Sequence, residues 1–194
     1  DAGPTLLDQG DGRVLDLEDP TIASQALPDH DLFGIVPGVD AVPLARDMGA
    51  VLFAMAINPQ TGALWQLGTE ANNKDPLKQT ELSIKGNIVQ NRLSIVADPG
   101  VGQPPVAPTA IRDLDLPPTR SVGQPYGLSF AGGFGLVTGL LTDNLVVLNT
   151  GGTYLGECAL PDGSIPRASL FASSSGNIFV YCWGTNKIEV HRLS

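Results

Sequence analysis

The residues best suited to chemistry in this sequence are the oxygen-bearing side chains of the segment TEANNKD. Glu70, Asn72, Asn73 and Asp75 offer four hard oxygen donors within a short stretch, and Ca²⁺ prefers such ligands. The spacing differs from that of an EF-hand loop, which needs a glycine at its sixth position and a terminal glutamate. A polar loop capped by its own side chains explains the same residues. The sequence therefore leaves open a calcium site and a structural loop, and it indicates no other cofactor.

Histidine chemistry is limited to His30 and His191, the two histidines of the chain. His30 lies between Asp29 and Asp31, where a carboxylate could orient it as a base, although a turn before a strand is the favoured explanation of these residues. His191 lies in the alternating segment KIEVHRL, which predicts a solvent-facing side chain. Because no Cys-x-x-Cys-His motif occurs, covalent c-type haem attachment is excluded for this chain, as is a histidine-rich zinc site.

Cys158 and Cys182 are the only cysteines. The internal repeat described below assigns them to the first and third strands of one sheet. A strand would then lie between them, and the separation would exceed the reach of a disulfide. We therefore predict two free thiols.

The charge and composition exclude several classes of partner. The chain has 11 Lys and Arg residues against 20 Asp and Glu residues, a net charge of −9, which repels nucleic-acid phosphates and anionic lipids. No apolar run reaches the roughly 18 residues of a membrane span. The 23 glycines and 16 prolines lie between apolar runs, which favours many short strands joined by turns. We interpret residues 1–194 as a single domain.

An internal repeat near the carboxyl end predicts how these strands are arranged. Segment 125–152 aligns with segment 166–194. In both, a proline opens an apolar strand, a glycine-containing turn leads to a second strand, and a tight polar turn leads to a third. The polar turns, at Asp143 and Asn186, lie about 43 residues apart, within the roughly 40–50 residues typical of propeller blades. Residues of these two types tolerate the positive φ that such turns require.

A third copy of the pattern lies upstream. AVLFAMAINPQTGALWQLGTEANN contains an apolar strand, a Pro-x-x-Gly turn and a second apolar strand. Its last strand is delayed until NRLSIVAD, which predicts an insertion over 74–90 between the third and fourth strands. Residues 98–125 are predicted to form a long Pro-rich loop. Further upstream, GRVLDL and HDLFGIV are expected to end an earlier blade, and AVPLARD to begin the next.

These copies predict an all-β fold, namely a β-propeller with about three to four four-stranded antiparallel blades in this chain. Propellers close with four to eight blades, so the chain is expected to form part of a larger or multi-chain propeller. The alternative is an ordinary β-sandwich whose strands are similar by chance.

The blade motifs resemble those of exported bacterial β-propeller repeat proteins of the YncE and YVTN type. The segments that carry the resemblance are NPQTGALWQLG, FGLVTGLLTDNLVVLN and GNIFVYCWGTNKIEVHRL, and it extends over about 32–194. It implies a propeller fold and a periplasmic or extracellular location. The block TEANN…GNIVQNRL is similar to an insertion in a periplasmic subgroup, some of whose members accompany or are fused to c-type cytochromes.

Two functions are compatible with these observations. In the first, the chain is a non-catalytic scaffold that mediates protein–protein interaction in an exported bacterial assembly. In the second, it is the propeller part of a periplasmic redox enzyme or electron-transfer complex, whose cofactor, such as c-type haem, is carried by another chain or domain. Because the sequence contains no catalytic constellation, the first function is favoured.

The predicted binding region combines residues 70–90, which contain the insertion, with the Pro-rich loop at 98–125, since loops carry binding on a repetitive scaffold. Its partner is a second protein or additional propeller blades. An alternative is that the insertion covers its own blade. The apolar side chains expected to contact the partner are Leu77, Leu82, Ile84, Ile88 and Val89.

Overall fold

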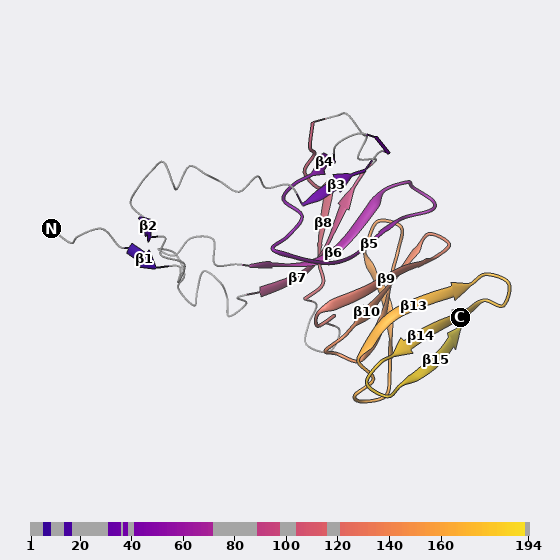
Figure 1. Ribbon diagram of the computed structural model, residues 1–194. Coiled ribbons are helices and arrows are strands. Elements are labelled where there is room, and N and C mark those ends of the chain that lie inside the picture. The colour runs from indigo at the N-terminus through magenta and orange to yellow at the C-terminus, as the bar shows by residue number, and fades with distance from the viewer. Residues whose placement is uncertain are drawn as a thin grey trace.

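The computed structural model describes most of the chain, with backbone placement alone for its first two stretches. The described residues are 6–8, 14–16, 31–35, 37–38, 41–71, 89–97, 104–115 and 121–192. Within them every regular element is a β-strand (Figure 1). The all-β prediction is therefore confirmed.

Three antiparallel sheets form the body of the described structure (Figure 1). Sheet I contains β5 (Val51–Ile57), β6 (Leu64–Ala71), β7 (Val89–Val96) and β8 (Ala110–Asp113), in that order. Sheet II contains β9 (Pro125–Ala131), β10 (Phe134–Gly139), β11 (Asn144–Leu148) and β12 (Tyr154–Ala159). Sheet III contains β13 (Pro166–Ala172), β14 (Asn177–Cys182) and β15 (Lys187–Arg192).

Two short antiparallel pairs precede these sheets. The first joins β1 (Leu6–Asp8) to β2 (Val14–Asp16), and the second joins β3 (Leu32–Gly34) to β4 (Val42–Ala45). The segment AVPLARD was expected to open a new blade, but β4 pairs with β3 instead, and the first strand of sheet I is β5.

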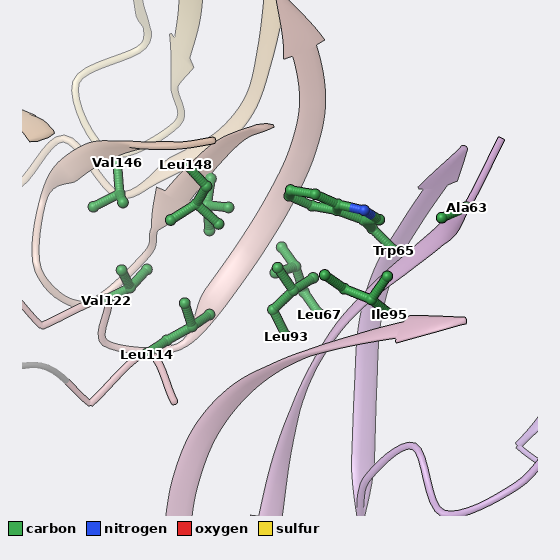
Figure 2. Close-up of a cluster of buried hydrophobic side chains, with 10 residues drawn as sticks. Ala63, Trp65, Leu67, Leu93, Ile95, Leu114, Val122, Val146 and Leu148 are labelled. Carbon is green, nitrogen blue, oxygen red and sulfur yellow. The ribbon is translucent and has the colours of Figure 1, made fainter. Parts of the chain in front are cut away.

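The three sheets stack face to face in chain order. The first strand of sheet II, β9, contacts the first strands of both neighbouring sheets, β5 and β13. A buried apolar cluster fills the space between sheets I and II (Figure 2). Its members include Trp65, Leu67, Leu93, Val137, Val146 and Leu148, all fully buried. Burial of apolar area of this kind is the main force that holds stacked sheets together.

Two further clusters of buried apolar side chains pack sheet III against sheet II and the β3–β4 pair against sheet I. Between sheets II and III the buried side chains include Leu136, Leu145, Ile178 and Val180. On the other face of sheet I, Met48 lies in a cluster with residues of β3, β4, β6 and β7. Each sheet therefore packs through side chains that alternate along its strands, as period-2 patterning requires.

The predicted turn chemistry is confirmed at both polar turns of the repeat. Asp143 has φ of 45° and Asn186 has φ of 52°. Each residue immediately precedes the return strand of its hairpin, which is β11 after Asp143 and β15 after Asn186. Gly62, the glycine of the Pro-x-x-Gly turn, also has a positive φ of 72° and donates its backbone N–H to the Asn58 carbonyl.

Two predicted boundaries in sheet I are wrong. The segment 98–125 is not loop throughout, because it contains β8, the outermost strand, which pairs with β7. NRLSIVAD accordingly supplies the third strand of the sheet. The insertion 74–90 therefore falls between the second and third strands, and its last residues begin β7. The rest of the insertion lies outside the described residues.

Candidate functional site

A groove of about 560 Å³ opens between sheets II and III. Its walls come from β10, β11, β12, β14 and β15, and they include the charged residues Glu157 and Arg192. The apolar side chains predominate, and they are Phe134, Leu145, Val147, Leu155 and Ile178. A volume of this size lies within the range of about 300–1,000 Å³ that is common for small-molecule sites.

The strand register explains why these side chains share the groove. Leu145 pairs with Cys158, and Val147 pairs with Gly156, so all four positions lie on the face of sheet II that is turned toward sheet III. Gly156 leaves its part of the wall bare, because a Cβ built there would meet no atom within 4 Å. On the opposite wall, the register pairs Ile178 with His191.

Cys158 and His191 meet inside this groove. The Cys158 Sγ lies 3.2 Å from the His191 Nδ1, a distance at which a thiol and an imidazole share a hydrogen bond. Burial raises the pKa of the Cys158 thiol above its ordinary value. The His191 Nε2 is buried and has no hydrogen-bond partner among the described residues. The groove therefore combines mostly apolar walls with one thiol–imidazole pair and with Glu157 and Arg192.

His191 was expected to face solvent, and this prediction is wrong. Its side chain is half-buried and points to the preceding sheet. Ile188 and Val190, on the opposite face of the same strand, are 64% and 54% exposed. The alternation along β15 was read correctly. Sheet II covers the face of β15 that carries His191, and the face that carries Ile188 and Val190 is exposed.

The prediction of two free thiols agrees with the structure, although the strand assignment behind it does not. Cys158 and Cys182 are both free. Cys158 lies on β12, the last strand of sheet II, and Cys182 lies on β14 of sheet III. Cys182 is fully buried in the cluster between the two sheets.

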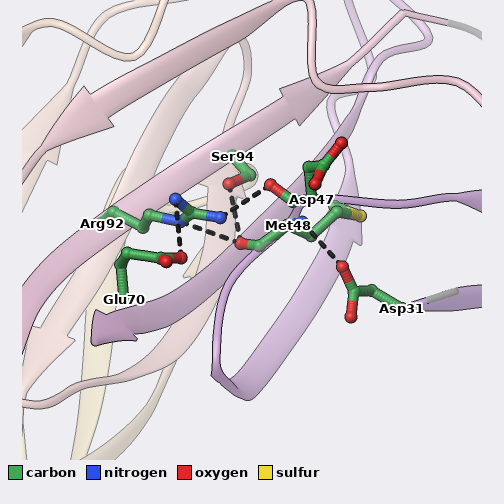
Figure 3. Close-up of polar contacts among 6 residues, drawn as sticks. All are labelled: Asp31, Asp47, Met48, Glu70, Arg92 and Ser94. Carbon is green, nitrogen blue, oxygen red and sulfur yellow. Dashed lines mark hydrogen bonds and ion pairs between the residues drawn. The ribbon is translucent and has the colours of Figure 1, made fainter. Parts of the chain in front are cut away.

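The side chains proposed as calcium ligands are only partly described. Asn72, Asn73 and Asp75 lie outside the described residues. Glu70 is buried on β6, where its Oε2 lies 2.9 Å from the Nη1 of Arg92 (Figure 3). Among the residues that the structure describes, no cluster of three metal-ligating side chains occurs.

Arg92 organises a polar network that the sequence did not reveal (Figure 3). Its Nε donates to the Met48 carbonyl at 3.0 Å, and its Nη2 donates to the Asp47 carbonyl at 2.7 Å. The Ser94 hydroxyl donates to the same Met48 carbonyl at 2.9 Å. The network fixes the turn before β5 onto sheet I, which is a structural role.

All five predicted partner-binding side chains fall within the insertion at 74–90. Leu77, Leu82, Ile84 and Ile88 lie outside the described residues. Val89, the first residue of β7, is 51% exposed and pairs with Ala71. The candidate base His30 also lies outside the described residues. The neighbouring Asp31 accepts a hydrogen bond from the Met48 backbone N–H at 2.7 Å.

A second candidate surface is the outer face of sheet III, the face turned away from sheet II. The register places five large apolar side chains on it: Leu170, Phe179, Tyr181, Ile188 and Val190. Phe179 is half-buried, and the other four are exposed. At one edge, the Arg167 guanidinium stacks over the Trp183 ring, 4.5 Å from its centroid. Within the described part of the chain, no element covers this face, which presents a continuous apolar strip.

The opposite end of the stack has a similar surface. Met55, Ile57 and Ile111 lie on the face of sheet I turned away from sheet II, and all three are exposed. The short pair β3–β4 covers another part of that face through Met48 and its neighbours.

Comparisons with known proteins identify the architecture. No protein-family model matches the chain, and no curated protein matches it. Among solved structures, Kuenenia stuttgartiensis hydrazine synthase is similar, with a TM-score of 0.54 and 12% identity over 79% of this chain and 47% of that chain. Staphylococcus aureus virginiamycin B lyase gives 0.44 and 14%, over 74% and 41% of the two chains. A Xanthomonas campestris gluconolactonase gives 0.43 and 17%, over 80% and 42%.

These identities bear on the fold alone. The chain has a β-propeller fold, as the sequence predicted. It spans less than half of the length of each of these three proteins. In the part of the chain that the structure describes, no helix is long and apolar enough to cross a membrane.

Proposed function

We propose that this chain is a protein-binding scaffold module, and that the outer face of sheet III binds a further antiparallel propeller blade. The observation that carries the proposal is the apolar strip of Leu170, Phe179, Tyr181, Ile188 and Val190 on that face. Contiguous exposed apolar surface on a folded protein marks an interaction site.

The stacking of the other sheets supports a blade as the occupant. The inner face of sheet III buries Ile178 and Val180 against sheet II, and sheet II buries Val146 and Leu148 against sheet I. The outer face of sheet III repeats the same strand geometry, with apolar side chains at every second position. The hydrazine synthase chain is longer than this one, since the match covers 79% of this chain but only 47% of that chain, and it thus leaves room for further blades.

The apolar strip is large enough to provide specific affinity. Full burial of one large apolar side chain contributes about 1.5–3 kcal/mol. Four exposed side chains therefore contribute on the order of 6–12 kcal/mol before the cost of association is subtracted.

Hydroxyl-radical footprinting of the protein as isolated tests this proposal. We expect Tyr181 and Val190 to be protected, whereas Leu141, which is 72% exposed on a turn, is labelled and serves as the reference. Replacement of Val190 by Lys should restore labelling of Tyr181. Labelling of Tyr181 and Val190 at rates set by their exposure in the 194-residue chain would overturn the proposal.

Sedimentation analysis then identifies where the blade comes from. A mass above that of one chain, lost in Val190→Lys, assigns the blade to a second polypeptide. A single-chain mass with the same protection assigns it to a further segment of the same protein. Both results require the protection that the proposal predicts.

We also propose kinship with the YncE and YVTN-type propellers and, with it, a periplasmic or extracellular location in an exported bacterial assembly. The Pro-x-x-Gly turn at 59–62 and the blade motifs support this proposal. Fractionation of the source cells tests the location. Haem or quinone bands in the absorbance spectrum of the native assembly would favour the redox alternative over a pure scaffold.

A further inference from the structure

The groove between sheets II and III is independent of the surface that carries the proposed function. Cys158 and His191 lie on the faces that sheets II and III turn toward each other, whereas the apolar strip lies on the opposite face of sheet III. We propose that this groove is a covalent modification site, in which Cys158 captures a small apolar α,β-unsaturated carbonyl compound and His191 takes the thiol proton.

The walls of the groove define the class of molecule. Leu145, Val147 and Ile178 line it, and Gly156 adds open space beside them. Such a surface binds an aromatic or aliphatic body through apolar burial. The only sulfur in the groove lies at its wall, within reach of a bound electrophile.

The thiol–imidazole contact supplies the chemistry. A thiolate is the nucleophile, whereas a thiol is a poor one, and burial keeps Cys158 protonated to a higher pH than usual because it raises the thiol pKa. A base in contact with the thiol is therefore required, and the His191 Nδ1 lies 3.2 Å from the sulfur.

The addition balances without any further reagent. The proton of Cys158 moves to His191 as the sulfur forms a bond to the β-carbon of the unsaturated carbonyl compound. The carbon–carbon π bond breaks, and its electron pair moves onto the carbonyl as an enolate. His191 then returns the proton to the α-carbon, which leaves a thioether and a neutral imidazole.

The second cysteine provides an internal control. Cys182 is fully buried in the cluster between the two sheets and does not line the groove. A buried cysteine without access is inert toward such reagents. In the folded protein, modification should therefore occur at Cys158 and spare Cys182.

The test uses N-phenylmaleimide and N-ethylmaleimide as apolar and smaller probes of the same class, with peptide mass spectrometry to locate the thioether. We expect Cys158 to react with saturation kinetics. The phenyl preference is the ratio of the rate with N-phenylmaleimide to the rate with N-ethylmaleimide. This ratio should be about tenfold higher in the folded protein than in the urea-unfolded protein. His191→Asn should slow the reaction by about tenfold or more, since a positioned base contributes at least this much.

Gly156→Val tests the groove itself. The added side chain projects into space that is open in the wild type, so the phenyl preference should be lost while the reaction with N-ethylmaleimide slows less. Gly156→Ala, with a smaller addition, serves as a second variant if the valine perturbs folding. Equal rates in folded and urea-unfolded protein, modification of Cys182 instead, or an unchanged phenyl preference in Gly156→Val would each overturn the proposal. None of these outcomes affects the footprinting of Tyr181 and Val190.

Discussion

The indole of Trp65 and the phenyl ring of Phe130 meet edge to face across the boundary between sheets I and II, with their centroids 5.1 Å apart and their planes inclined by 72°. Aromatic pairs favour this geometry because the positive ring edge faces the negative π surface. Strand β10 passes close to the same indole at Gly135, where a Cβ would lie 2.5 Å from the Trp65 Cζ3. Trp65 thus occupies the space that a side chain at 135 would need.

Gly135→Ala should therefore destabilise the protein by about 1–3 kcal/mol through overpacking. Urea denaturation measures the change in the free energy of unfolding. Gly156→Ala is the matched control, because its Cβ would meet no atom within 4 Å, and its stability should stay within about 0.5 kcal/mol of wild type. In Trp65→Leu, the penalty of the alanine at 135 should shrink. An undiminished penalty would show that the indole is not its cause.

Glu70→Gln should destabilise the protein by about 3–5 kcal/mol, because it leaves the Arg92 charge buried without its carboxylate partner. The double variant Glu70→Leu, Arg92→Met removes both charges and should recover part of the loss. Asp47→Asn is the matched control. The ion pair between Asp47 and Arg46 is 4.0 Å long and both side chains are 57% exposed, so its loss should cost less than about 1 kcal/mol.

The ion pair between Glu70 and Arg92 also gives a prediction for calcium. Glu70 is engaged with Arg92, so we expect millimolar CaCl₂ to leave the thermal midpoint of the wild type unchanged. A ligand that binds the native state would raise that midpoint. A calcium-dependent rise that Glu70→Gln abolishes would support the calcium interpretation of the TEANNKD segment.

The sequence predicted the strands and their turns well, because the relevant signals are local. Asp143 and Asn186 take the positive φ that their residue types allow. Along β15 the alternation is visible in the sequence, but the choice of covered face is not. Ile188 and Val190 are apolar and yet exposed, because the neighbouring sheet lies on the side of His191. Alternation separates two faces and leaves open which of them a neighbouring sheet covers.

Contacts between strands account for the features that sequence reasoning missed. Glu70 was grouped with its neighbours along the chain, whereas its partner Arg92 lies diagonally across the ladder, since Gly68 is the residue opposite Arg92. Strand β8 has four residues within a Pro-rich stretch and is recognised only through its pairing with β7. The Cys158–His191 contact joins two sheets, and neither local sequence contains a signal for it.

Cys182 should make stability fall as the solution becomes alkaline. Burial is the main cause that raises the pKa of its thiol above the ordinary value of 9.0, and the charge of Glu189 adds to the rise while the contact with Ser164 opposes it. Above pH 9 the unfolded chain loses a proton that the native state still holds. The native state then binds more protons, so the free energy of unfolding decreases with pH.

The Cys182→Ala variant tests this effect through the slope of unfolding free energy against pH between about 8 and 10.5. We expect a shallower decline than in wild type. Val180→Ala removes apolar bulk from the same buried cluster without removing a thiol, and it should keep the wild-type slope at a lower stability. Identical slopes in Cys182→Ala and wild type would exclude a contribution from this thiol.

Glycine should have opposite effects at Asp143 and Asn186, although both occupy equivalent turns with positive φ. The Asp143 carboxylate accepts hydrogen bonds from the backbone N–H groups of Gly163 and Ile165, at 2.8 and 2.7 Å. Ile165 itself has φ of 47°, an unfavourable conformation for a β-branched residue, and Asp143 helps to hold it there. The turn at Asn186 is held by its backbone N–H, which donates to the Trp183 carbonyl.

Asn186→Gly should therefore leave stability unchanged or raise it by up to about 1 kcal/mol, because glycine adopts positive φ without steric cost. Asp143→Gly gains the same relief but loses two hydrogen bonds to a charged acceptor, each worth about 1.5–3 kcal/mol, so it should destabilise the protein. Asp143→Asn, which keeps the tolerance for positive φ and one acceptor oxygen, should fall between Asp143→Gly and wild type. Urea denaturation of the three variants measures these differences. Equal effects of glycine at the two positions would mean that the Asp143 carboxylate contributes nothing beyond its own turn.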